Sequence, residues 1–337
     1  MLKDKKIFIK TFGCVQNQAD SERVKAFYED LGYEEVGDWK KANLVIINSC
    51  VVRESAENRV YGLINNILNF DKKIKIVLTG CLAGLKRAKV LADKVEILPI
   101  SDISYEIEPL RSAKETALIP ISSGCDNFCS FCIVPYARGR EKSKSEGKIL
   151  AEIDKAIENG FKKVMLIGQN VNSYRKGGFV KLLEKVAKKK LEKISFISSN
   201  PWDFSDELVE TISKNKNIDR LIHLPLQSGD DKILKKMKRK YSAEQYLNLV
   251  RKIRKRIDGV TFSTDILIGF PGEDKKAFEN TVELCKKVGF KTAYLNKYSP
   301  RAGTVSARLY KDDVPTEEKK RRWRALDKLV NKRNHLK

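Results

Sequence analysis

The alternation of apolar and amphipathic segments limits the fold of this 337-residue chain more than any other feature. Short apolar runs alternate with stretches of helical periodicity, a pattern typical of a parallel sheet covered by helices on both faces. We therefore predict an α/β fold in which residues 1–98 form a domain with a parallel sheet. Its expected strands are 6–12, 44–49 and 74–80, and its expected helices are 21–32 and 56–70.

A second alternation follows residues 99–116, which interrupt the pattern and are expected to form a linker. Residues 117–300 predict a partial, TIM-like (β/α)6 barrel, whose functional residues gather at the carboxyl ends of the strands. Residues 301–337 are expected to form a basic helical extension. The barrel strands are expected at 117–122, 163–168, 193–198, 220–226, 260–269 and 292–299, with helices at 145–159, 205–214, 242–256 and 275–287.

Three cysteines of the first domain, Cys14, Cys50 and Cys81, each come directly after one of its expected strands. Parallel strands end at one edge of a sheet, and ligands gather beyond that edge. We therefore expect the three thiols to share a site although they are far apart in sequence. The alternative is three unrelated buried cysteines, because free cysteine is common in protein cores.

A second cysteine group lies in the segment GCDNFCSFCIVPYARGRE, where Cys125, Cys129 and Cys132 form a C-x3-C-x2-C run after the first expected barrel strand. The chain has no apolar run of membrane-spanning length and no signal-peptide pattern, so we expect a cytoplasmic protein without membrane association. Seven cysteines, an odd number, in a reducing compartment argue against a disulfide framework. Metal or redox chemistry is the favoured use.

Zinc is a poor match for the three-cysteine run, because a structural zinc site needs four ligands. His223 and His335 are the only histidines and neither has a suitable spacing. Cys285 lies on the apolar face of an expected helix, so we expect it in the core. A [4Fe-4S] cluster on three thiolates keeps one iron open, and S-adenosylmethionine on such an iron yields a 5′-deoxyadenosyl radical. The run has the radical-SAM signature, with Phe131 as its aromatic residue.

The net charge of +23 predicts a polyanionic partner, most simply a nucleic acid. Basic residues cluster at Lys235–Lys240, Arg251–Arg256 and Lys319–Arg324. Two alternatives remain open: a generally lysine-rich composition, and clusters that are solvated helix faces.

The segments around both cysteine groups together resemble the radical-SAM methylthiotransferase family over nearly the whole chain. The first domain carries TFGCVQNQADSE, NSCVVRESAENRVYG and LTGC; the barrel carries the cysteine run, LIGQNVNSY, HLPLQSG, MKRKY and DILIGFPGE. CVVRESAENRVYG and GQNVNSY are most similar to the branch that makes 2-methylthio-N6-isopentenyladenosine (also called dimethylallyladenosine) in tRNA. Family members commonly end with a small RNA-binding TRAM module, which we do not expect in these residues, so the basic helices would carry part of the RNA contact.

The resemblance implies an enzyme that inserts a methylthio group at C2 of N6-isopentenyladenosine beside the anticodon. It implies two S-adenosylmethionine molecules, one as methyl donor to sulfur and one as radical source. It also implies a tRNA anticodon stem-loop, a reduced flavodoxin- or ferredoxin-type electron donor and a sulfur donor as partners, and we expect a monomer. The two implied [4Fe-4S] clusters are a radical-generating one on Cys125, Cys129 and Cys132 and an auxiliary one on Cys14, Cys50 and Cys81.

Other substrates stay open as hypotheses. One is N6-threonylcarbamoyladenosine in tRNA, another is an aspartate of a ribosomal protein, although the QNVN segment is unusual for both of those branches. A non-enzymatic hypothesis is an RNA-binding protein that holds an iron-sulfur cluster or zinc.

Residues that follow other barrel strands are expected to bind the cofactor. Amide groups there can recognise an adenine edge or a methionine group, and the GFPGE turn brings backbone close to a ligand. The alternatives are loop capping and a plain turn. The predicted cofactor-binding residues are Gln169, Asn170, Gln227, Ser228, Gly269, Gly272 and Glu273.

Charged residues beside the cysteines have weaker expected roles. Arg53 and Glu54 would orient the auxiliary cluster or a nucleotide, unless they only begin a helix. Arg138 and Arg140 would bind phosphate or carboxylate, unless they form surface ion pairs. His223 is expected to be structural.

Overall fold

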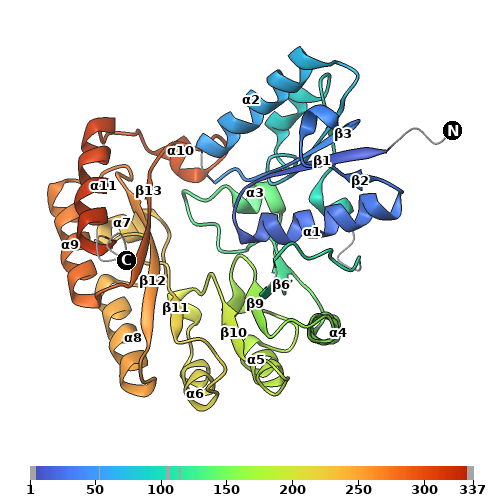
Figure 1. Cartoon of the computed structure of the whole chain (residues 1–337). Helices are drawn as coiled ribbons and strands as arrows, with labels where there is room; N and C mark the ends of the chain where they lie inside the picture. The colour runs from blue at the N-terminus through green and yellow to red at the C-terminus, as the bar shows by residue number, and fades with distance from the viewer. Residues whose placement is uncertain (1–4, 53, 104–106, 114, 332–337) are drawn as a thin grey trace.

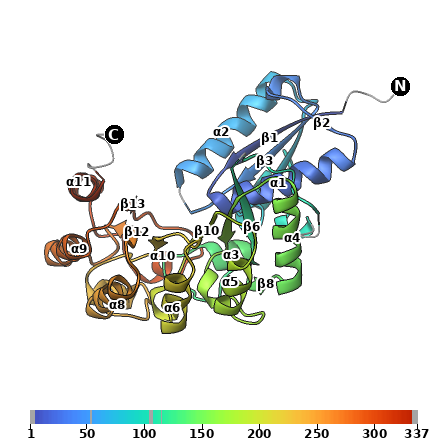
Figure 2. The same cartoon turned by 60° about the horizontal axis from the view of Figure 1, so that its bottom comes forward.

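The computed structural model describes residues 5–52, 54–103, 107–113 and 115–331 (Figure 1). It shows two α/β units, each built on parallel strands, so the predicted fold class is confirmed. The amino-terminal unit lies against the strand side of the second unit, whose helices form an arc on the opposite side (Figure 2).

The first unit is a five-stranded parallel sheet in the order β2-β1-β3-β4-β5. The three predicted strands are present, whereas the two-residue edge strands β2 and β5 were not predicted. The strands are β1 (Lys6–Phe12), β2 (Glu34–Glu35), β3 (Leu44–Ser49), β4 (Lys75–Gly80) and β5 (Glu96–Ile97), and the helices are α1 (Val15–Asp30), η1 (Trp39–Lys41), α2 (Glu54–Phe70), η2 (Lys86–Leu91) and η3 (Ile100–Asp102).

The central strand β3 shows why the segment LVIINS forms a doubly covered strand. All of its residues are buried. Val45 and Ile47 pack into the core beneath α2, whereas Leu44 and Ile46 pack into the core beneath α1. Side chains alternate between the faces of a strand, so a continuous apolar run satisfies both cores.

The second unit contains six parallel strands whose spatial order follows the chain. β6, β9 and β10 form one sheet, β11, β12 and β13 form another, and a bridge between Ile194 and Ile218 connects them. The strands are β6 (Thr116–Pro120), β9 (Lys163–Ile167), β10 (Lys193–Phe196), β11 (Leu221–His223), β12 (Thr261–Ile268) and β13 (Thr292–Lys297), and an antiparallel pair joins β7 (Ser122–Ser123) to β8 (Lys142–Ser143).

Helices on the outside of these strands begin and end at recognisable caps. Ser242 and Gln245 form a capping box at the start of α8, Asp274 caps α9, and Gly289 ends α9 with a φ of 60°. The predicted helices are present, whereas α3, α5 and α7 were not predicted. The helices are α3 (Val134–Arg138), α4 (Glu146–Glu158), η4 (Val171–Ser173), α5 (Phe179–Ala187), η5 (Pro201–Asp203), α6 (Asp206–Lys214), α7 (Asp231–Lys236), α8 (Ala243–Arg256), α9 (Lys275–Val288), α10 (Val305–Leu309) and α11 (Thr316–Val330).

The helix α11 covers one end of the barrel sheet. It packs on β13, β12 and α9, and the indole Nε1 of Trp323 donates to the Leu295 carbonyl at 3.1 Å. Leu326 and Cys285 are both buried in the same core, which confirms the expected core position of Cys285. Across the described ranges, no helix has the length and apolar character needed to cross a membrane.

Buried charges connect the two units. Arg23 on α1 and Arg111 each donate to one oxygen of Glu152 on α4, at 2.7 and 3.1 Å, and Lys144 pairs with its other oxygen. The Arg23 and Glu152 side chains are only 2% and 9% exposed. Because a buried charge without its partner is costly, this cluster fixes α1 against α4.

Candidate active site

The strand register brings the first three cysteines to one edge of the sheet. Phe12 pairs with Ser49 and Ser49 pairs with Gly80, so the last residues of β1, β3 and β4 lie side by side. The cysteines follow at once: the Cys50 and Cys81 amides continue the ladder by donating to the neighbouring strand at 2.7 Å, and Cys14 is the N-cap of α1. The parallel fold thus gives the convergence that the sequence predicts. We call Cys14, Cys50 and Cys81 the amino-terminal trio.

Arg138 of α3 extends from the barrel unit to this trio. Its Nε donates to the Cys81 Sγ at 3.0 Å, and its Nη2 pairs with Asp20 at 2.6 Å, with both charged side chains buried. A hydrogen bond shared with Cys50 lowers the pKa of Cys81 and raises that of Cys50; burial opposes the effect on Cys81, and Arg138 assists it. Cys81 is therefore the thiol of this trio that is stabilised as a thiolate.

The second group, Cys125, Cys129 and Cys132, lies on a loop that is fixed from two sides. The Cys125 amide donates to the Gly139 carbonyl at 3.2 Å, and Ser130 bonds the end of α7 through its amide and its hydroxyl. We call these three residues the barrel trio. Burial raises the pKa of Cys132 to about 12, so a thiolate there requires a nearby cation.

Arg239 supplies one such cation. Its Nη1 lies 3.5 Å from the Cys129 Sγ, and its Nη2 donates to the Pro225 carbonyl at 3.1 Å. The guanidinium also stacks over the Trp202 ring, 4.7 Å from the centroid. The side chain is therefore held in place from three directions with one edge toward the barrel trio.

A cavity of about 200 Å³ opens in front of the barrel trio. All three cysteines line it, together with the predicted residues Gln169 and Gln227 and with two residues that were not predicted, Arg239 and Asp265. The cysteine loop follows β7, Gln169 follows β9 and Gln227 follows β11, whereas Asp265 lies within β12. The cavity therefore lies at the carboxyl ends of the strands, as the barrel fold predicts.

The backbone is strained around this cavity. Among the described residues, four that are not glycine have a positive φ, and three of these, Phe128, Ser198 and Gln227, line it, with φ of 46°, 70° and 68°. Such conformations cost free energy and are concentrated at functional sites. The strain indicates that the fold holds these residues in place for a ligand.

A larger cavity of about 620 Å³ adjoins the first. The two share Val52, Phe131, Cys132, Gln227 and Asp265 as lining residues. Its other walls come from Glu54 and Ser55 of the amino-terminal unit, the end of β13, and Lys319 of α11. The volume is in the range of small-molecule sites.

The two trios fit iron-sulfur clusters better than single metal ions. In the described part of the chain, no three His, Cys, Asp or Glu side chains are close enough to ligate one ion. A cluster binds each thiolate through a different iron and so accepts thiols that are further apart. The described residues lining the small cavity include no fourth cysteine and no histidine, so a cluster there would keep one iron without a protein ligand.

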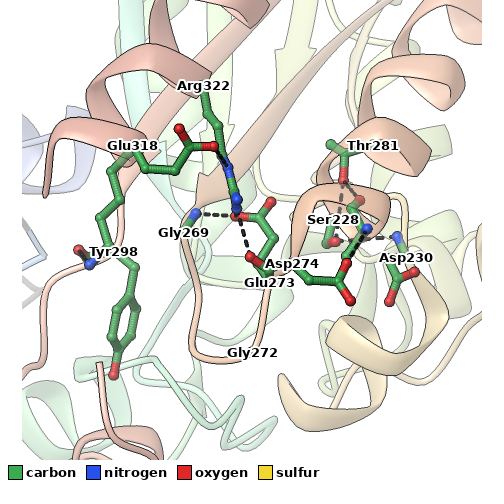
Figure 3. Close-up of polar contacts among 12 residues, drawn as sticks. Ser228, Asp230, Gly269, Gly272, Glu273, Asp274, Thr281, Tyr298, Glu318 and Arg322 are labelled. Carbon is green, nitrogen blue, oxygen red and sulfur yellow. Dashed lines mark hydrogen bonds and ion pairs between the residues drawn. The ribbon is translucent and has the colours of Figure 1, made fainter. Parts of the chain in front are cut away.

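Five of the seven predicted cofactor-binding residues, Asn170, Ser228, Gly269, Gly272 and Glu273, are not among the lining residues of either cavity. The Glu273 carboxylate accepts from the Gly269 amide and from Arg322 at 3.2 Å, and Arg322 also donates to Glu318 at 2.7 Å (Figure 3). Glu273 is 3% exposed, and burial raises the pKa of its carboxyl to about 7. These hydrogen bonds hold the GFPGE turn, which follows β12, against α11.

Ser228 and Gly272 also have structural partners. The Ser228 hydroxyl accepts from the Asp230 amide at 3.2 Å and lies 3.4 Å from the Thr281 hydroxyl (Figure 3). The Gly272 amide donates to Asp313 at 2.8 Å. The role of Ser228, Gly269, Gly272 and Glu273 in cofactor binding stays a prediction.

Among the remaining predicted polar residues, some line a cavity and others bond neighbouring side chains. Asn170 is buried and bonds Ser173 and, at 3.4 Å, Asp203. Glu54 lines the larger cavity, whereas Arg53 lies outside the described residues. Arg140 forms a largely exposed ion pair with Asp126, which is the alternative given above for this residue.

His223 orients a carboxylate that the sequence did not single out. Its Nε2 lies 3.1 Å from the Asp265 carboxylate, and its Nδ1 lies 3.0 Å from the Ser263 hydroxyl. Asp265 lines both cavities, whereas His223 lines neither and holds the Asp265 carboxylate from outside the cavity wall. A charged residue inside the apolar run VTFSTDILIG was the available signal.

The basic clusters are used partly inside the protein. In Lys319–Arg324, Lys319 is buried on Asp312 at 2.6 Å, and Arg321 and Arg322 both pair with Glu318. Arg239 of the first cluster is held against Cys129. These side chains stabilise the barrel. Fewer positive charges are therefore available to a partner than the sequence of these segments indicates.

Comparisons with known proteins agree with this geometry. Residues 119–285 match the model of the Radical SAM superfamily, and residues 6–99 match Uncharacterized protein family UPF0004. A protein of Thermotoga petrophila named tRNA-2-methylthio-N(6)-dimethylallyladenosine synthase is 38% identical over 98% of this chain and 82% of its own length. A Bacillus anthracis protein of the same name is 37% identical over 97% of this chain and 72% of its own length. The chain belongs to the radical-SAM methylthiotransferase family.

Solved structures support the fold of this methylthiotransferase. The radical S-adenosylmethionine methyltransferase TsrM from Kitasatospora setae, with cobalamin and a [4Fe-4S] cluster bound, matches with a TM-score of 0.63 over 90% of this chain and 77% of that chain, at 14% identity. The cobalamin-dependent radical enzyme OxsB matches with a TM-score of 0.57 over 90% of this chain and 55% of that chain, at 10% identity.

The methylthiotransferase is therefore an enzyme whose cofactors are [4Fe-4S] clusters and S-adenosylmethionine. The predictions of family, enzyme class and cofactors are confirmed. Its substrate and the residues that hold each cofactor are proposals, which follow.

Proposed function

We propose that this methylthiotransferase inserts a methylthio group at C2 of N6-isopentenyladenosine beside the anticodon of tRNA. The names of relatives at 37% and 38% identity support a tRNA substrate and this modified adenosine. The proposed partners are the tRNA anticodon stem-loop, a reduced flavodoxin- or ferredoxin-type electron donor and a sulfur donor.

The observation that carries the proposal is the wall of the larger cavity. Val52, Glu54 and Ser55, which follow Cys50, form one side of it, and Phe131 and Cys132 form another. A substrate in this cavity is therefore in contact with residues adjoining both cysteine trios. An enzyme that brings a sulfur group and a radical to one carbon atom requires this arrangement.

The six cysteines have separate proposed tasks. The barrel trio, Cys125, Cys129 and Cys132, would hold the radical-generating cluster, and the amino-terminal trio, Cys14, Cys50 and Cys81, would hold the auxiliary cluster. When bound, the two clusters and two molecules of S-adenosylmethionine would supply the radical and the methylated sulfur.

Two arginines support these thiolates. Arg239 lies against Cys129 and Arg138 against Cys81, at 3.5 and 3.0 Å. A cation that donates a hydrogen bond to sulfur stabilises its thiolate form, which is the form that binds iron. Each guanidinium also has a second partner that holds it beside the sulfur, the Pro225 carbonyl for Arg239 and Asp20 for Arg138.

Polar groups on the cavity walls would orient the small molecules. Gln169 and Gln227 offer amide donors and acceptors beside the barrel trio. Asp265, held by His223, offers a carboxylate at the junction of the cavities. A carboxylate accepts hydrogen bonds only, so it would select an amino or hydroxyl group of S-adenosylmethionine or of the substrate nucleoside.

The domain division proposed with this function is an auxiliary-cluster domain at 1–98, a linker at 99–116, a radical-SAM barrel at 117–300 and a basic extension at 301–337. The packing of α11 on β13 supports treating the extension as a cover of the barrel.

Nucleoside analysis tests the function directly. Digested tRNA from a strain lacking the gene should contain N6-isopentenyladenosine in place of its 2-methylthio derivative, and the gene should restore the derivative. Unchanged 2-methylthio-N6-isopentenyladenosine would refute the substrate assignment. Loss of a methylthio group from threonylcarbamoyladenosine or from a ribosomal-protein aspartate would indicate one of the other substrates.

A further inference from the structure

A second large cavity, of about 770 Å³, lies apart from the two cavities described above and contains none of the six cysteines in its wall. It is formed where the end of β4 and residues 99–103 of the first unit meet α3, the β7–β8 pair and the start of α4. We call it the hinge-side cavity. The activity proposed above does not use it.

The wall of the hinge-side cavity is strongly cationic. Arg138, Lys142, Lys144, Lys148 and Lys176 all line it, and none of the described lining residues is acidic. Lys142 and Lys176 are exposed at the rim. Arg138 and Lys144 lie deeper and are fixed by Asp20 and Glu152, so they shape the wall as much as they charge it.

Hydroxyl groups add neutral donors to this wall. Ser123, Ser143 and Ser145 all line it.

The start of α4 adds backbone donors. Ser145 is the N-cap of this 13-residue helix and forms no side-chain cap hydrogen bond. The first amides of a helix have no partners within it and favour an anion. The acidic residue of the first turn, Glu146, is paired with Lys185 at 2.5 Å and does not line the cavity.

We propose that the hinge-side cavity is a phosphate-binding site. Lysine ammonium groups, serine hydroxyls and helix amides together are the donors that hold a phosphate group. The volume exceeds the need of one ion, so the phosphate belongs to a nucleotide, either a unit of the RNA strand or a free nucleotide. The RNA source rests on the proposed function, whereas the phosphate site does not.

The test measures two kinds of binding. Calorimetry with inorganic phosphate and with AMP reports free-phosphate binding, and fluorescence anisotropy with a labelled tRNA anticodon hairpin at several salt concentrations reports RNA binding. The rim variant is Lys142→Gln with Lys176→Gln. Its matched control is Lys72→Gln with Lys73→Gln, an equal charge change in the exposed turn before β4, at the opposite edge of the sheet from the amino-terminal trio.

An RNA source predicts that the rim variant weakens hairpin binding and reduces the salt slope by about 1.4, from two single-strand phosphate contacts at about 0.7 each. A free-nucleotide source predicts weaker AMP and phosphate binding with an unchanged hairpin affinity. The control pair should match the wild type.

Equal affinities of the rim variant and the wild type for phosphate, AMP and hairpin would overturn the proposal. The two proposals fail separately. If the wild type binds AMP, the rim variant weakens that binding and the hairpin does not bind, the substrate assignment fails and the phosphate site stands.

Discussion

Replacing Glu152 by glutamine tests whether the buried charge cluster holds the two units together. The wild-type carboxylate receives Arg23 at 2.7 Å, Arg111 at 3.1 Å and Lys144. Glutamine keeps the size of the side chain but removes the charge that compensates three buried cations. Removing one partner of a buried ion pair costs about 3–5 kcal/mol, and we expect a loss of that size in the free energy of unfolding at neutral pH.

The pKa of Glu152 determines how the stability difference between wild type and Glu152→Gln should change with pH. Burial alone would raise the pKa of Glu152, but Arg23, Lys144 and Arg111 outweigh it and lower the pKa below its ordinary value of 4.5. A lowered pKa means that the stabilisation is present above the unfolded-state value and is lost as the pH falls through the folded-state value. The difference between wild type and Glu152→Gln should therefore be largest at neutral pH and shrink below about pH 4.5.

Urea unfolding followed by tryptophan fluorescence measures the difference, because Trp39 reports the first unit while Trp202 and Trp323 report the barrel. The control is Glu210→Gln, since Glu210 is 56% exposed and pairs with Lys214 on the same helix. We expect the control to unfold at the same urea concentration as the wild type, because an exposed ion pair contributes little to stability. A Glu152→Gln variant as stable as the control would refute the conclusion that this cluster holds the two units together. A stability difference from the wild type that grows in acid would refute it as well.

Three further predictions concern the site. Cys129→Ala should abolish 5′-deoxyadenosine formation, whereas Cys50→Ala should keep it and lose methylthiolation; wild-type methylthiolation by Cys50→Ala would contradict the auxiliary role. Asp265→Asn should lower methylthiolation about tenfold or more through loss of a charged hydrogen bond, with iron content unchanged in a colorimetric assay, and full activity would remove Asp265 from the site. Burial raises the pKa of Glu273 to about 7, so its contribution to stability is complete below the ordinary value of 4.5 and is lost as the pH rises toward 7. Denaturation across this range should show wild type losing stability relative to Glu273→Gln, and parallel pH curves would disprove the raised pKa.

The sequence predicted those parts of the fold that depend on local pattern. Residues 44–49 are apolar on both sides of the strand, so β3 could be placed to the residue. The edge strand β2, which pairs only through Glu34 and Glu35, carries no apolar pattern and could not be. Helix α5 was missed because it begins after Gly178 without a side-chain cap, whereas the equally short α6 begins after the capping residue Ser205.

Site residues could be predicted where their spacing along the chain is characteristic, but not where their positions depend on tertiary contacts. Cys125, Cys129 and Cys132 could be identified because their spacing is characteristic. Glu273 is bonded by Arg322, which lies 49 residues further along, and no local pattern shows that pairing. Asp265 was missed although a charged residue in an apolar run marked it, because only the packing of the barrel shows that it lines the cavities.

The position of Arg138 constrains how this enzyme can exchange parts with its relatives. By sequence the residue belongs to the segment that carries the barrel trio, but by contact it belongs to the amino-terminal trio, where it donates to Cys81 and pairs with Asp20. In a chimera joined within the linker, Cys81 would come from one protein, whereas the arginine that donates to it would come from another. The inherited unit is therefore the amino-terminal domain together with α3, and sequence changes in the two should be correlated across the linker.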